Sequence, residues 1–362
     1  MKEASTVVGN QSPHDEAITE VRERLQEDLS KVRKSLCSLV VPPNHRIQGP
    51  IMYAVENTGR LLRPTLVLLS SYLLEDGWQG VTPPHVIDGA AAVEILHLAT
   101  LCHDDVIDGA QVRRGRPSAN AKYGEAVALL TGDYLLARCM QTAASLGMSR
   151  MTAMADTLID VCVGQMLESS QLYDPFRTEE EYFAAISGKT ARLLRTAAAM
   201  GALQSGASED AQAALESFGH NLGMAFQIWD DILDICSRET GKQAAKDILN
   251  GVYTLPVIYA VKDFQDRLQS LLRLQPLSDG QCQEVISLVH ESGAIGRAAD
   301  VAQRYVSDAL YAVESHPATA KHAPVVRQCL RDLVDTFASQ HPALQALRDT
   351  AQPTPDGLHS AT

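Results

Sequence analysis

The sequence predicts an all-α protein built as a single large helical bundle, and two observations lead to this expectation. Apolar residues recur at three- and four-residue spacing over most of the 362 residues, and hardly any segment alternates apolar with polar positions as a half-buried strand does. Hydrophobic residues make up 45% of the chain and charged residues 21%, a balance typical of a globular protein with one large core.

The helices predicted from this periodicity follow one another along the chain. They cover Ala17–Leu39, Ile51–Leu74, Val86–Ile107, Glu125–Leu146, Met151–Leu172, Glu179–Leu203, Glu209–Ile235, Leu255–Leu274, Gln281–Tyr311 and Ala323–Phe337. Proline, glycine and asparagine mark the breaks, as in Val41–Asn44, Gly109–Pro117 and Ser237–Thr254. No linker rich in Pro, Gly or Ser divides the chain, so we expect one domain over residues 1–350 and a disordered tail over residues 351–362.

Charge and cysteine content exclude several classes of protein. The net charge is -13 and no run of Lys and Arg occurs, which argues against a nucleic-acid partner. The seven cysteines are scattered without a Cys-x-x-Cys pair, so neither a disulfide framework nor a zinc site is expected. The first residues lack the features of a signal peptide, and the apolar runs are too short for a transmembrane segment. We therefore expect a cytoplasmic location.

An aspartate-rich segment, HDDVID at residues 103–108, ends the predicted helix Val86–Ile107. Asp104 and Asp108 share one helical face, about 6 Å apart along the axis. Carboxylates at a helix C-terminus oppose the helix macrodipole, so a cationic partner is expected beside them. Taken alone, one such motif is as often a solvated helix end as a metal site.

A second aspartate-rich segment, QIWDDILD at residues 227–234, ends the predicted helix Glu209–Ile235. Its Gln227, Asp230 and Asp234 fall within one narrow arc of the helix. If the two helices are neighbours, their carboxylates face each other across a cavity and supply the hard oxygen ligands that suit Mg²⁺. Because Mg²⁺ binds through few carboxylates together with substrate phosphate, the pattern favours a diphosphate ligand.

With these two DDxxD motifs the chain resembles the trans-isoprenyl diphosphate synthases, or polyprenyl synthetases, from about Ile51 to Tyr259. The other shared segments are TGRLLRP (58–64), His97, RRG (113–115), TGD (131–133), GKT (188–190), FQ (226–227), GK (241–242) and TLP (254–256). The resemblance implies an isoprenoid synthase type of bundle around a central apolar cavity. It also implies a prenyltransferase that joins isopentenyl diphosphate head to tail to an allylic diphosphate.

The resemblance assigns the motif aspartates to metal binding. The candidate ligands are Asp104, Asp105, Asp108, Asp230, Asp231 and Asp234, and the mechanism of such enzymes relies chiefly on Asp104, Asp108 and Asp230. About three Mg²⁺ ions per site are implied, for which Mn²⁺ can substitute. They neutralise the leaving diphosphate, and the allyl cation that forms is attacked by the double bond of isopentenyl diphosphate. No protein nucleophile or organic cofactor is expected.

Basic and polar residues are assigned in the same way. Isopentenyl diphosphate is expected to bind Arg60, Arg63, His97 and Arg114, and the allylic diphosphate Arg113, Lys189 and Lys242. Thr190 and Gln227 would place oxygen dipoles near the developing cation. Gly188-Lys189-Thr190 is not a nucleotide-binding P-loop, because Phe183 stands where that motif needs glycine. The chain departs from the family at Thr58, Arg60 and Leu61, in place of Gly, Lys and Arg, and at Val252 in place of Lys.

Two features bear on the product and on assembly. Ala99 and Thr100 are small where short-chain synthases carry aromatic residues, which favours a medium or long product, hexaprenyl or beyond. Several segments also resemble the catalytic subunit of two-component heptaprenyl diphosphate synthases. A homodimer is expected by analogy, and a heteromer with a small subunit is the other possibility.

Three other functions compete with this interpretation. A farnesyl or geranylgeranyl diphosphate synthase differs from it only in product length. A class I terpene cyclase shares the fold and one DDxxD, but its second motif has the NSE pattern and it lacks a second diphosphate site. A regulatory subunit of a heteromeric synthase tends to lose the aspartates that this chain retains.

Overall fold

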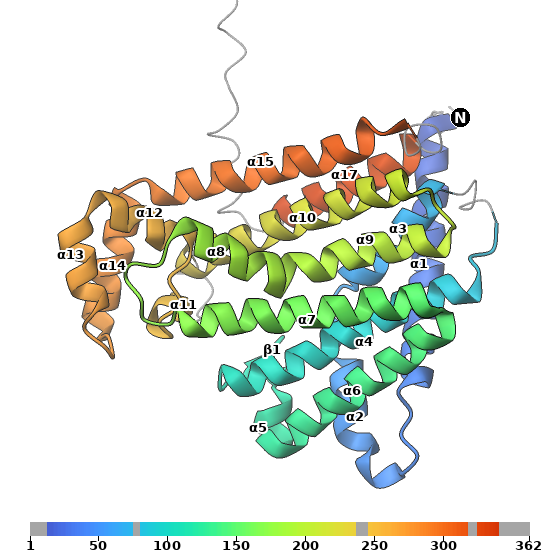
Figure 1. Cartoon of the computed structure of the whole chain (residues 1–362), viewed down its shortest axis with the longest axis horizontal. Helices are drawn as coiled ribbons and strands as arrows, with labels where there is room; N and C mark the ends of the chain where they lie inside the picture. Colours follow the sequence, from blue (N-terminus) through green and yellow to red (C-terminus); the bar gives the residue numbers. More distant parts are fainter. Residues whose placement is uncertain (1–12, 75–79, 237–244, 318–323, 340–362) are drawn as a thin grey trace, which may run out of the picture. The chain divides into compact units, whose positions relative to one another are not determined.

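The computed structural model describes residues 13–74, 80–236, 245–317 and 324–339 (Figure 1). Helices make up almost all of its regular structure, which confirms the all-α prediction. The chain forms two compact units: unit 1 comprises residues 1–151, 199–212 and 313–332, and unit 2 the remainder. The single domain over residues 1–350 stays a prediction, and the tail 351–362 lies outside the described residues.

Unit 1 is organised around α4 (Pro84–Ile107), which is buried along most of its length and packs against α1 (Pro13–Leu39), α3 (Leu62–Leu74) and α6 (Glu125–Leu146) (Figure 1). The other elements of its first part are η1 (His45–Ile47), α2 (Gln48–Glu56), α5 (Ala119–Tyr123) and the antiparallel strand pair β1 (Val112–Arg113) and β2 (Arg116–Pro117). The first DDxxD motif therefore ends the central helix of this unit.

Helix α4 is long and apolar enough to cross a membrane by length and composition alone, and it is the one such helix in the described part of the chain. In the structure, 83% of its most apolar stretch is buried against the rest of the protein. A core helix meets the same criteria, so α4 gives no reason to revise the expectation of a chain without a membrane span. The cytoplasmic location stays a prediction.

Unit 2 holds most of α7 (Met148–Ser170), α10 (Glu209–Cys236) and α15 (Ala294–Glu314), and part of α9 (Arg192–Gln204) and α17 (Pro324–Ser339). Its shorter elements are α8 (Glu179–Ile186), the π-helical turn η3 (Ser187–Ala191), α11 (Lys246–Leu249), α12 (Leu255–Asp263), α13 (Gln265–Leu272) and α14 (Asp279–Glu291). A capping box between Thr178 and Glu181 begins α8, and η3 follows it directly. The second DDxxD motif ends α10.

Several helices that the sequence predicted as continuous are interrupted in the structure. The expected helix Ile51–Leu74 is two helices, because residues 57–61 are not helical and Leu61 has a φ of 54°. The Arg114 guanidinium lies against this break, since a Cβ on Gly59 would stand 2.9 Å from its Cζ. The expected helix Gln281–Tyr311 likewise divides at Gly293, whose φ of 67° suits glycine.

Three smaller differences from the predicted elements remain. The helix expected over Leu255–Leu274 divides at Phe264 into α12 and α13, and the one over Glu179–Leu203 contains the π-helical turn η3. The loop Gly109–Pro117 contains the strand pair, which the periodicity did not predict.

A buried carboxylate holds the N-terminal helix of unit 1 in place. Asp28 on α1 is fully buried and accepts hydrogen bonds from Tyr72 on α3 (2.6 Å), Arg24 (2.9 Å), Lys31 (2.7 Å) and the hydroxyl of Thr82 just before α4. Burial raises the pKa of Asp28, but the hydrogen bonds from Lys31, Thr82, Tyr72 and Arg24 outweigh it and leave the pKa below its usual value.

We predict that Asp28→Asn lowers the free energy of unfolding by about 2 kcal/mol at neutral pH, because the neutral amide that replaces this buried carboxylate cannot accept the hydrogen bonds of all four partners. The folded-state pKa is depressed, so this contribution is present at neutral pH and is lost as the pH falls through that pKa. Urea unfolding at pH 7 and at pH 3 measures both effects, and the difference between wild type and variant should shrink at the lower pH.

Glu284→Gln is the matched control, because it removes an exposed ion pair with Arg267 that should change stability by less than about 1 kcal/mol. An Asp28→Asn protein as stable as wild type at pH 7 would contradict the anchoring role.

Candidate active site

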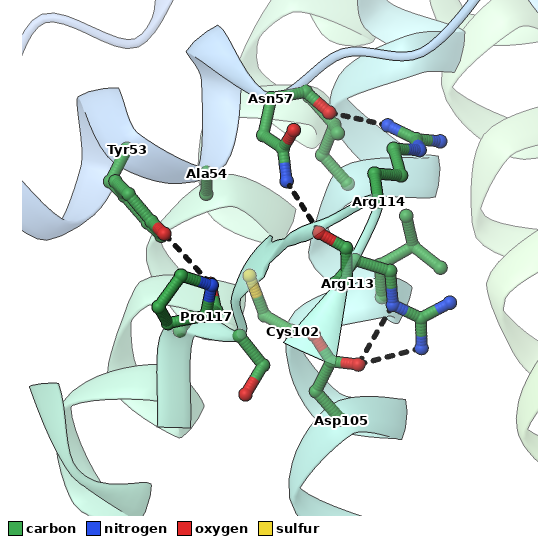
Figure 2. A pocket seen from close by; sticks show the side chains of 12 residues that line it. Tyr53, Ala54, Asn57, Cys102, Asp105, Arg113, Arg114 and Pro117 are labelled. Atoms are coloured by element: carbon green, nitrogen blue, oxygen red, sulfur yellow. Dashed lines mark hydrogen bonds and ion pairs between the residues drawn. The ribbon is translucent and has the colours of Figure 1, made fainter. Parts of the chain in front are cut away.

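The first DDxxD motif is held by its second aspartate. Asp105, only 4% exposed, accepts two hydrogen bonds at Oδ1 from Arg113, from Nε at 2.8 Å and from Nη2 at 2.6 Å (Figure 2). The tight turn between β1 and β2, with Arg114 and Gly115 at positive φ, brings Arg113 back over the end of α4. Asp104 is partly exposed and Asp108 is exposed, so these two carboxylates remain accessible to a ligand.

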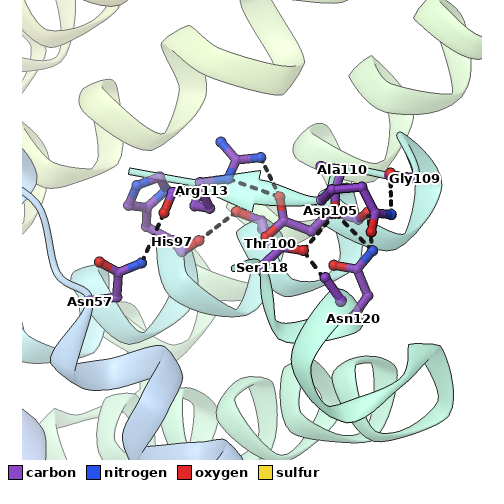
Figure 3. A network of polar contacts seen from close by, with 11 residues as sticks. Asn57, His97, Thr100, Asp105, Gly109, Ala110, Arg113, Ser118 and Asn120 are labelled. Atoms are coloured by element: carbon purple, nitrogen blue, oxygen red, sulfur yellow. Dashed lines mark hydrogen bonds and ion pairs between the residues drawn. The ribbon is translucent and has the colours of Figure 1, made fainter. Parts of the chain in front are cut away.

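A polar network fixes the chain as it leaves α4. The Asn120 side chain donates 3.0 Å hydrogen bonds to the backbone carbonyls of Asp105 and Ala110, and the Ser118 hydroxyl donates to the carbonyl of Ala110 at 2.5 Å (Figure 3). These bonds satisfy carbonyl groups that a helix C-terminus leaves without partners. These contacts therefore fix the backbone of the last turn of α4, which carries the motif.

The break between α2 and α3 is tied to the same hairpin. Arg114 Nη1 donates to the carbonyl of Asn57, and Asn57 Nδ2 donates to the carbonyl of Arg113 at 3.5 Å. The segment that carries Arg60 and Arg63 thus begins next to Arg113 and Arg114. Arg60 itself is exposed and Arg63 is partly buried.

Cationic groups gather around His97, which is buried one turn beyond Glu94 on α4. Burial lowers the pKa of His97 well below its usual value, and the positive charges of Arg63 and Arg114 lower it further. Burial also lowers the pKa of Arg63, to about 10, so at neutral pH the arginine is charged and the imidazole is neutral. A neutral imidazole can still donate one hydrogen bond to a phosphate oxygen.

Glu94 is the carboxylate that balances this cluster, and the sequence analysis missed it. It is buried, which raises its pKa, while the charges of Arg63, Arg114 and Arg33 lower it. A lone acidic residue inside the apolar stretch AAVEIL was the available signal. Buried carboxylates without a partner are costly, which is a reason to expect nearby cations.

A small pocket opens beside the first motif between the hairpin, α2 and α4. Tyr53, Asn57, Cys102 and Asp105 contribute to its lining, together with Arg113 and Arg114 (Figure 2). Its free volume of about 30 Å³ suits a water molecule and is too small for a prenyl group. The predicted chain-length residues, Ala99 and Thr100, lie elsewhere on α4, where both are buried.

The second DDxxD motif is likewise held by its second aspartate. Asp231, 3% exposed, accepts hydrogen bonds from the Tyr182 hydroxyl at 2.6 Å and from Gln227 Nε2 at 2.8 Å. Gln227 Oε1 in turn accepts from the Thr190 hydroxyl at 2.7 Å. Three predicted site residues are thus brought together. Burial raises the pKa of Asp231 to about 7, and the charge of nearby Asp230 contributes to the increase.

The last aspartate of this motif organises the chain after α10. Asp234 Oδ1 accepts from the backbone N–H of Lys246 at 3.2 Å, and its Oδ2 accepts from that of Asp247 at 3.1 Å. Burial raises the pKa of Asp247 well above its usual value, and the charges of Asp234, Asp231 and Asp230 raise it further. Asp247 is thus an additional carboxylate beside the motif that the sequence analysis did not single out. The exposed Asp230 stands at the surface of this acidic group.

Lys189 is positioned by the π-helical turn η3. Its ammonium group forms an ion pair with Glu168 on α7, a partner that the sequence analysis also missed. A Cβ on Gly164 would stand 2.3 Å from the Lys189 backbone nitrogen, and one on Gly223 would stand 2.5 Å from the Ala191 Cα. Only glycine therefore lets α7 and α10 approach the turn this closely.

Some predicted features are not tested by these contacts. Lys242 lies outside the described residues. The two motifs belong to different units, so their opposition across a cavity stays a prediction. Among the described residues no three His, Cys, Asp or Glu side chains form a ready-made metal site. The donor set still fits Mg²⁺, which needs only one or two carboxylates when waters and phosphate complete its coordination.

The fold is all-α, a long helix in each unit ends in a DDxxD motif, and arginines lie beside the first motif. Residues 44–289 match the sequence profile described as polyprenyl synthetase. The chain belongs to the polyprenyl synthetase family and is a prenyltransferase.

Individual relatives agree with this assignment. A nonaprenyl diphosphate synthase of Mycobacterium tuberculosis is 37% identical over 78% of this chain and 83% of its own length. A heptaprenyl diphosphate synthase component 2 of Geobacillus stearothermophilus is 36% identical over 85% of this chain and 94% of its own length. The crystal structure of a decaprenyl diphosphate synthase from Rhodobacter capsulatus is similar with a TM-score of 0.80 and 31% identity, covering 93% of this chain and 100% of that one.

Proposed function

We propose that this protein is a trans-polyprenyl diphosphate synthase that condenses isopentenyl diphosphate with an allylic diphosphate in the presence of Mg²⁺. The observation that carries the proposal is the shared construction of the two motifs. In each, the second aspartate is buried and hydrogen-bonded, while the first remains accessible. A related polyprenyl synthase of Caulobacter crescentus was crystallised with calcium and isoprenyl diphosphate, which supports divalent cations and diphosphates as ligands of this architecture.

Asp104, Asp108 and Asp230 are the residues proposed to hold about three Mg²⁺ ions, or Mn²⁺ in their place. When bound, the ions neutralise charge on the departing diphosphate, which makes ionisation of the allylic carbon possible. Lys189, Arg113 and Lys242 are proposed to bind the same diphosphate. Lys189 and Arg113 are already oriented, by Glu168 and Asp105 respectively.

Isopentenyl diphosphate is proposed to bind Arg60, Arg63, His97 and Arg114. Arginine suits this role because its planar fork binds phosphate oxygens at two points. The neutral His97 adds a donor without a further charge. Thr190 and Gln227 hold each other through the 2.7 Å hydrogen bond, so their oxygen dipoles have a fixed orientation toward a developing cation. Substrate positioning and electrostatics then account for catalysis without a protein nucleophile.

We predict that Asp104→Asn and Asp230→Asn each lower turnover about 100-fold or more, because each removes a charge that stabilises the metal–diphosphate complex. The assay supplies radiolabelled isopentenyl diphosphate, an allylic primer and Mg²⁺, and measures product by extraction. Asp332→Asn is the control, since it removes an exposed ion pair with Arg22 and should retain turnover. Full turnover in either motif variant would refute the proposal, and a cyclised hydrocarbon product would point to a terpene cyclase.

The product is proposed to be a medium or long polyprenyl chain. Relatives named heptaprenyl, octaprenyl and nonaprenyl diphosphate synthases support this range. Solved geranylgeranyl diphosphate synthases are also similar, for example one from Corynebacterium glutamicum with 32% identity and a TM-score of 0.76, so a shorter product is the alternative. Product sizing by thin-layer chromatography distinguishes the two.

We predict that Ala99→Tyr shortens the product by at least one isoprene unit, because an aromatic ring on this buried face of α4 would block the path of the growing chain. Ala99→Ser should leave the length unchanged, which separates ring size from any effect of substitution alone. An Ala99→Tyr enzyme that stays folded and makes wild-type products would show that this position does not set the length.

The assembly is proposed to be a homodimer that forms through α7. Ile159, Val163 and Met166 are 59%, 50% and 70% exposed, and their spacing of four and three residues places them on one stripe of the helix. A second copy can cover this stripe by pairing α7 with α7. Two relatives are named as component 2 of heptaprenyl diphosphate synthases, so a small partner subunit is the alternative occupant.

Met166→Lys is expected to weaken self-association at least tenfold, because it places a charge on the apolar stripe. Sedimentation equilibrium measures the change, with Leu274→Lys, an exposed apolar position outside the stripe, as the control. A wild-type protein that is monomeric yet fully active would overturn the homodimer.

A further inference from the structure

Tyr182 is a buried phenol that touches the second motif although no part of the proposed mechanism uses it. Its side chain is 1% exposed, and its hydroxyl donates to Asp231 Oδ2 at 2.6 Å. The hydrogen bonding continues from Asp231 to Gln227 and from Gln227 to Thr190. The four side chains thus form one chain of polar contacts. The chain joins α8, α10 and η3.

The tyrosine itself is firmly held. The guanidinium of Arg177 lies over its ring, 5.5 Å from the centroid, and Arg177 is in turn fixed by hydrogen bonds to Gln171 Oε1 (2.8 Å) and to the carbonyl of Tyr253 (3.0 Å). Arg177 is buried as well. The hydroxyl of Tyr182 therefore has little freedom to leave Asp231.

Two members of this chain, Asp231 and Thr190, adjoin residues proposed to bind the allylic diphosphate complex. Asp231 is next to Asp230, so anchoring Asp231 fixes the rotation of the last turns of α10 and with it the direction of the Asp230 carboxylate. Thr190 is next to Lys189 on the π-helical turn. One set of hydrogen bonds thus relates a proposed metal ligand to a proposed diphosphate ligand.

We propose that Tyr182 is a positioning residue which, through Asp231, aligns Asp230 and Lys189 for the metal-bound allylic diphosphate and has no part in binding isopentenyl diphosphate. The proposal rests on the proposed function. It assigns Asp231 to orientation rather than to direct metal binding, because its two oxygens already accept hydrogen bonds from Tyr182 and Gln227. Outer hydrogen-bond partners of metal ligands commonly have such effects.

The test is Tyr182→Phe, which removes a single oxygen and keeps the ring under Arg177. We expect the Mg²⁺ concentration for half-maximal activity to rise about tenfold and kcat to fall about tenfold. The KM for isopentenyl diphosphate should change less than twofold, because its proposed ligands are not among the four residues that this chain of hydrogen bonds joins.

Tyr253→Phe is the matched control in the same unit. Tyr253 is equally buried, and its hydroxyl donates to the carbonyl of Leu272 at 2.9 Å, away from the motif. Both variants should lose some stability in thermal unfolding, because Tyr182→Phe removes one hydrogen bond and Tyr253→Phe removes two, the second being the one that the Tyr253 hydroxyl accepts from Gln275 Nε2 at 3.1 Å. Only Tyr182→Phe should change the Mg²⁺ requirement. An equal Mg²⁺ requirement in the two variants would reduce Tyr182 to a structural role and overturn the proposal.

A second readout separates this inference from the proposed function. Calorimetry with inorganic diphosphate and Mg²⁺ measures binding without turnover, and Tyr182→Phe should bind about tenfold more weakly than wild type and Tyr253→Phe. If wild type makes no polyprenyl product but this difference holds, the proposed function fails and the positioning role stands. If wild type is active and the three proteins bind diphosphate equally, the positioning role fails alone.

Discussion

The structure depends on how it buries one carboxylate in each aspartate motif. A buried carboxylate is tolerated only when hydrogen bonds or opposite charges compensate for lost water. Asp105 is compensated by Arg113 and Asp231 by Tyr182 and Gln227, so each motif is anchored to its own unit by its second residue. These hydrogen bonds fix the ends of α4 and α10, which carry the accessible Asp104 and Asp230. The proposed metal binding requires these helix ends to be rigid.

The same logic explains how a chain of net charge -13 can bind anionic substrates. Basic side chains form local clusters. Each of these clusters lies beside an acidic side chain from a neighbouring element, which offsets its positive charge. Glu94 lies among Arg63, Arg114 and Arg33, and Glu168 pairs with Lys189. Under the proposed function, phosphate oxygens of a bound diphosphate would take over part of the contacts that these acids make with the cations.

The sequence was sufficient for the all-α class, the family and the two motifs, because each depends on local periodicity or on short ordered segments. It failed at the break between α2 and α3, where the apolar spacing continues but Leu61 takes a left-handed conformation and the Arg114 guanidinium lies against Gly59. Tyr182, Glu94 and Glu168 were missed for a related reason. Their importance comes from partners that lie far away in sequence, and a single sequence does not show such contacts. The Tyr182 hydroxyl, for instance, reaches an aspartate on another helix.

The central claim is that both motifs bind metal around one diphosphate, and it is tested most directly by a crystal structure grown with Mn²⁺ and an unreactive allylic thiodiphosphate. Anomalous scattering locates the Mn²⁺ ions without reference to the protein. The account predicts ions about 2 Å from carboxylate oxygens of Asp104, Asp108 and Asp230, all bridged by the same diphosphate. Ions bound at one motif alone, or at the two motifs with no shared diphosphate, would contradict it.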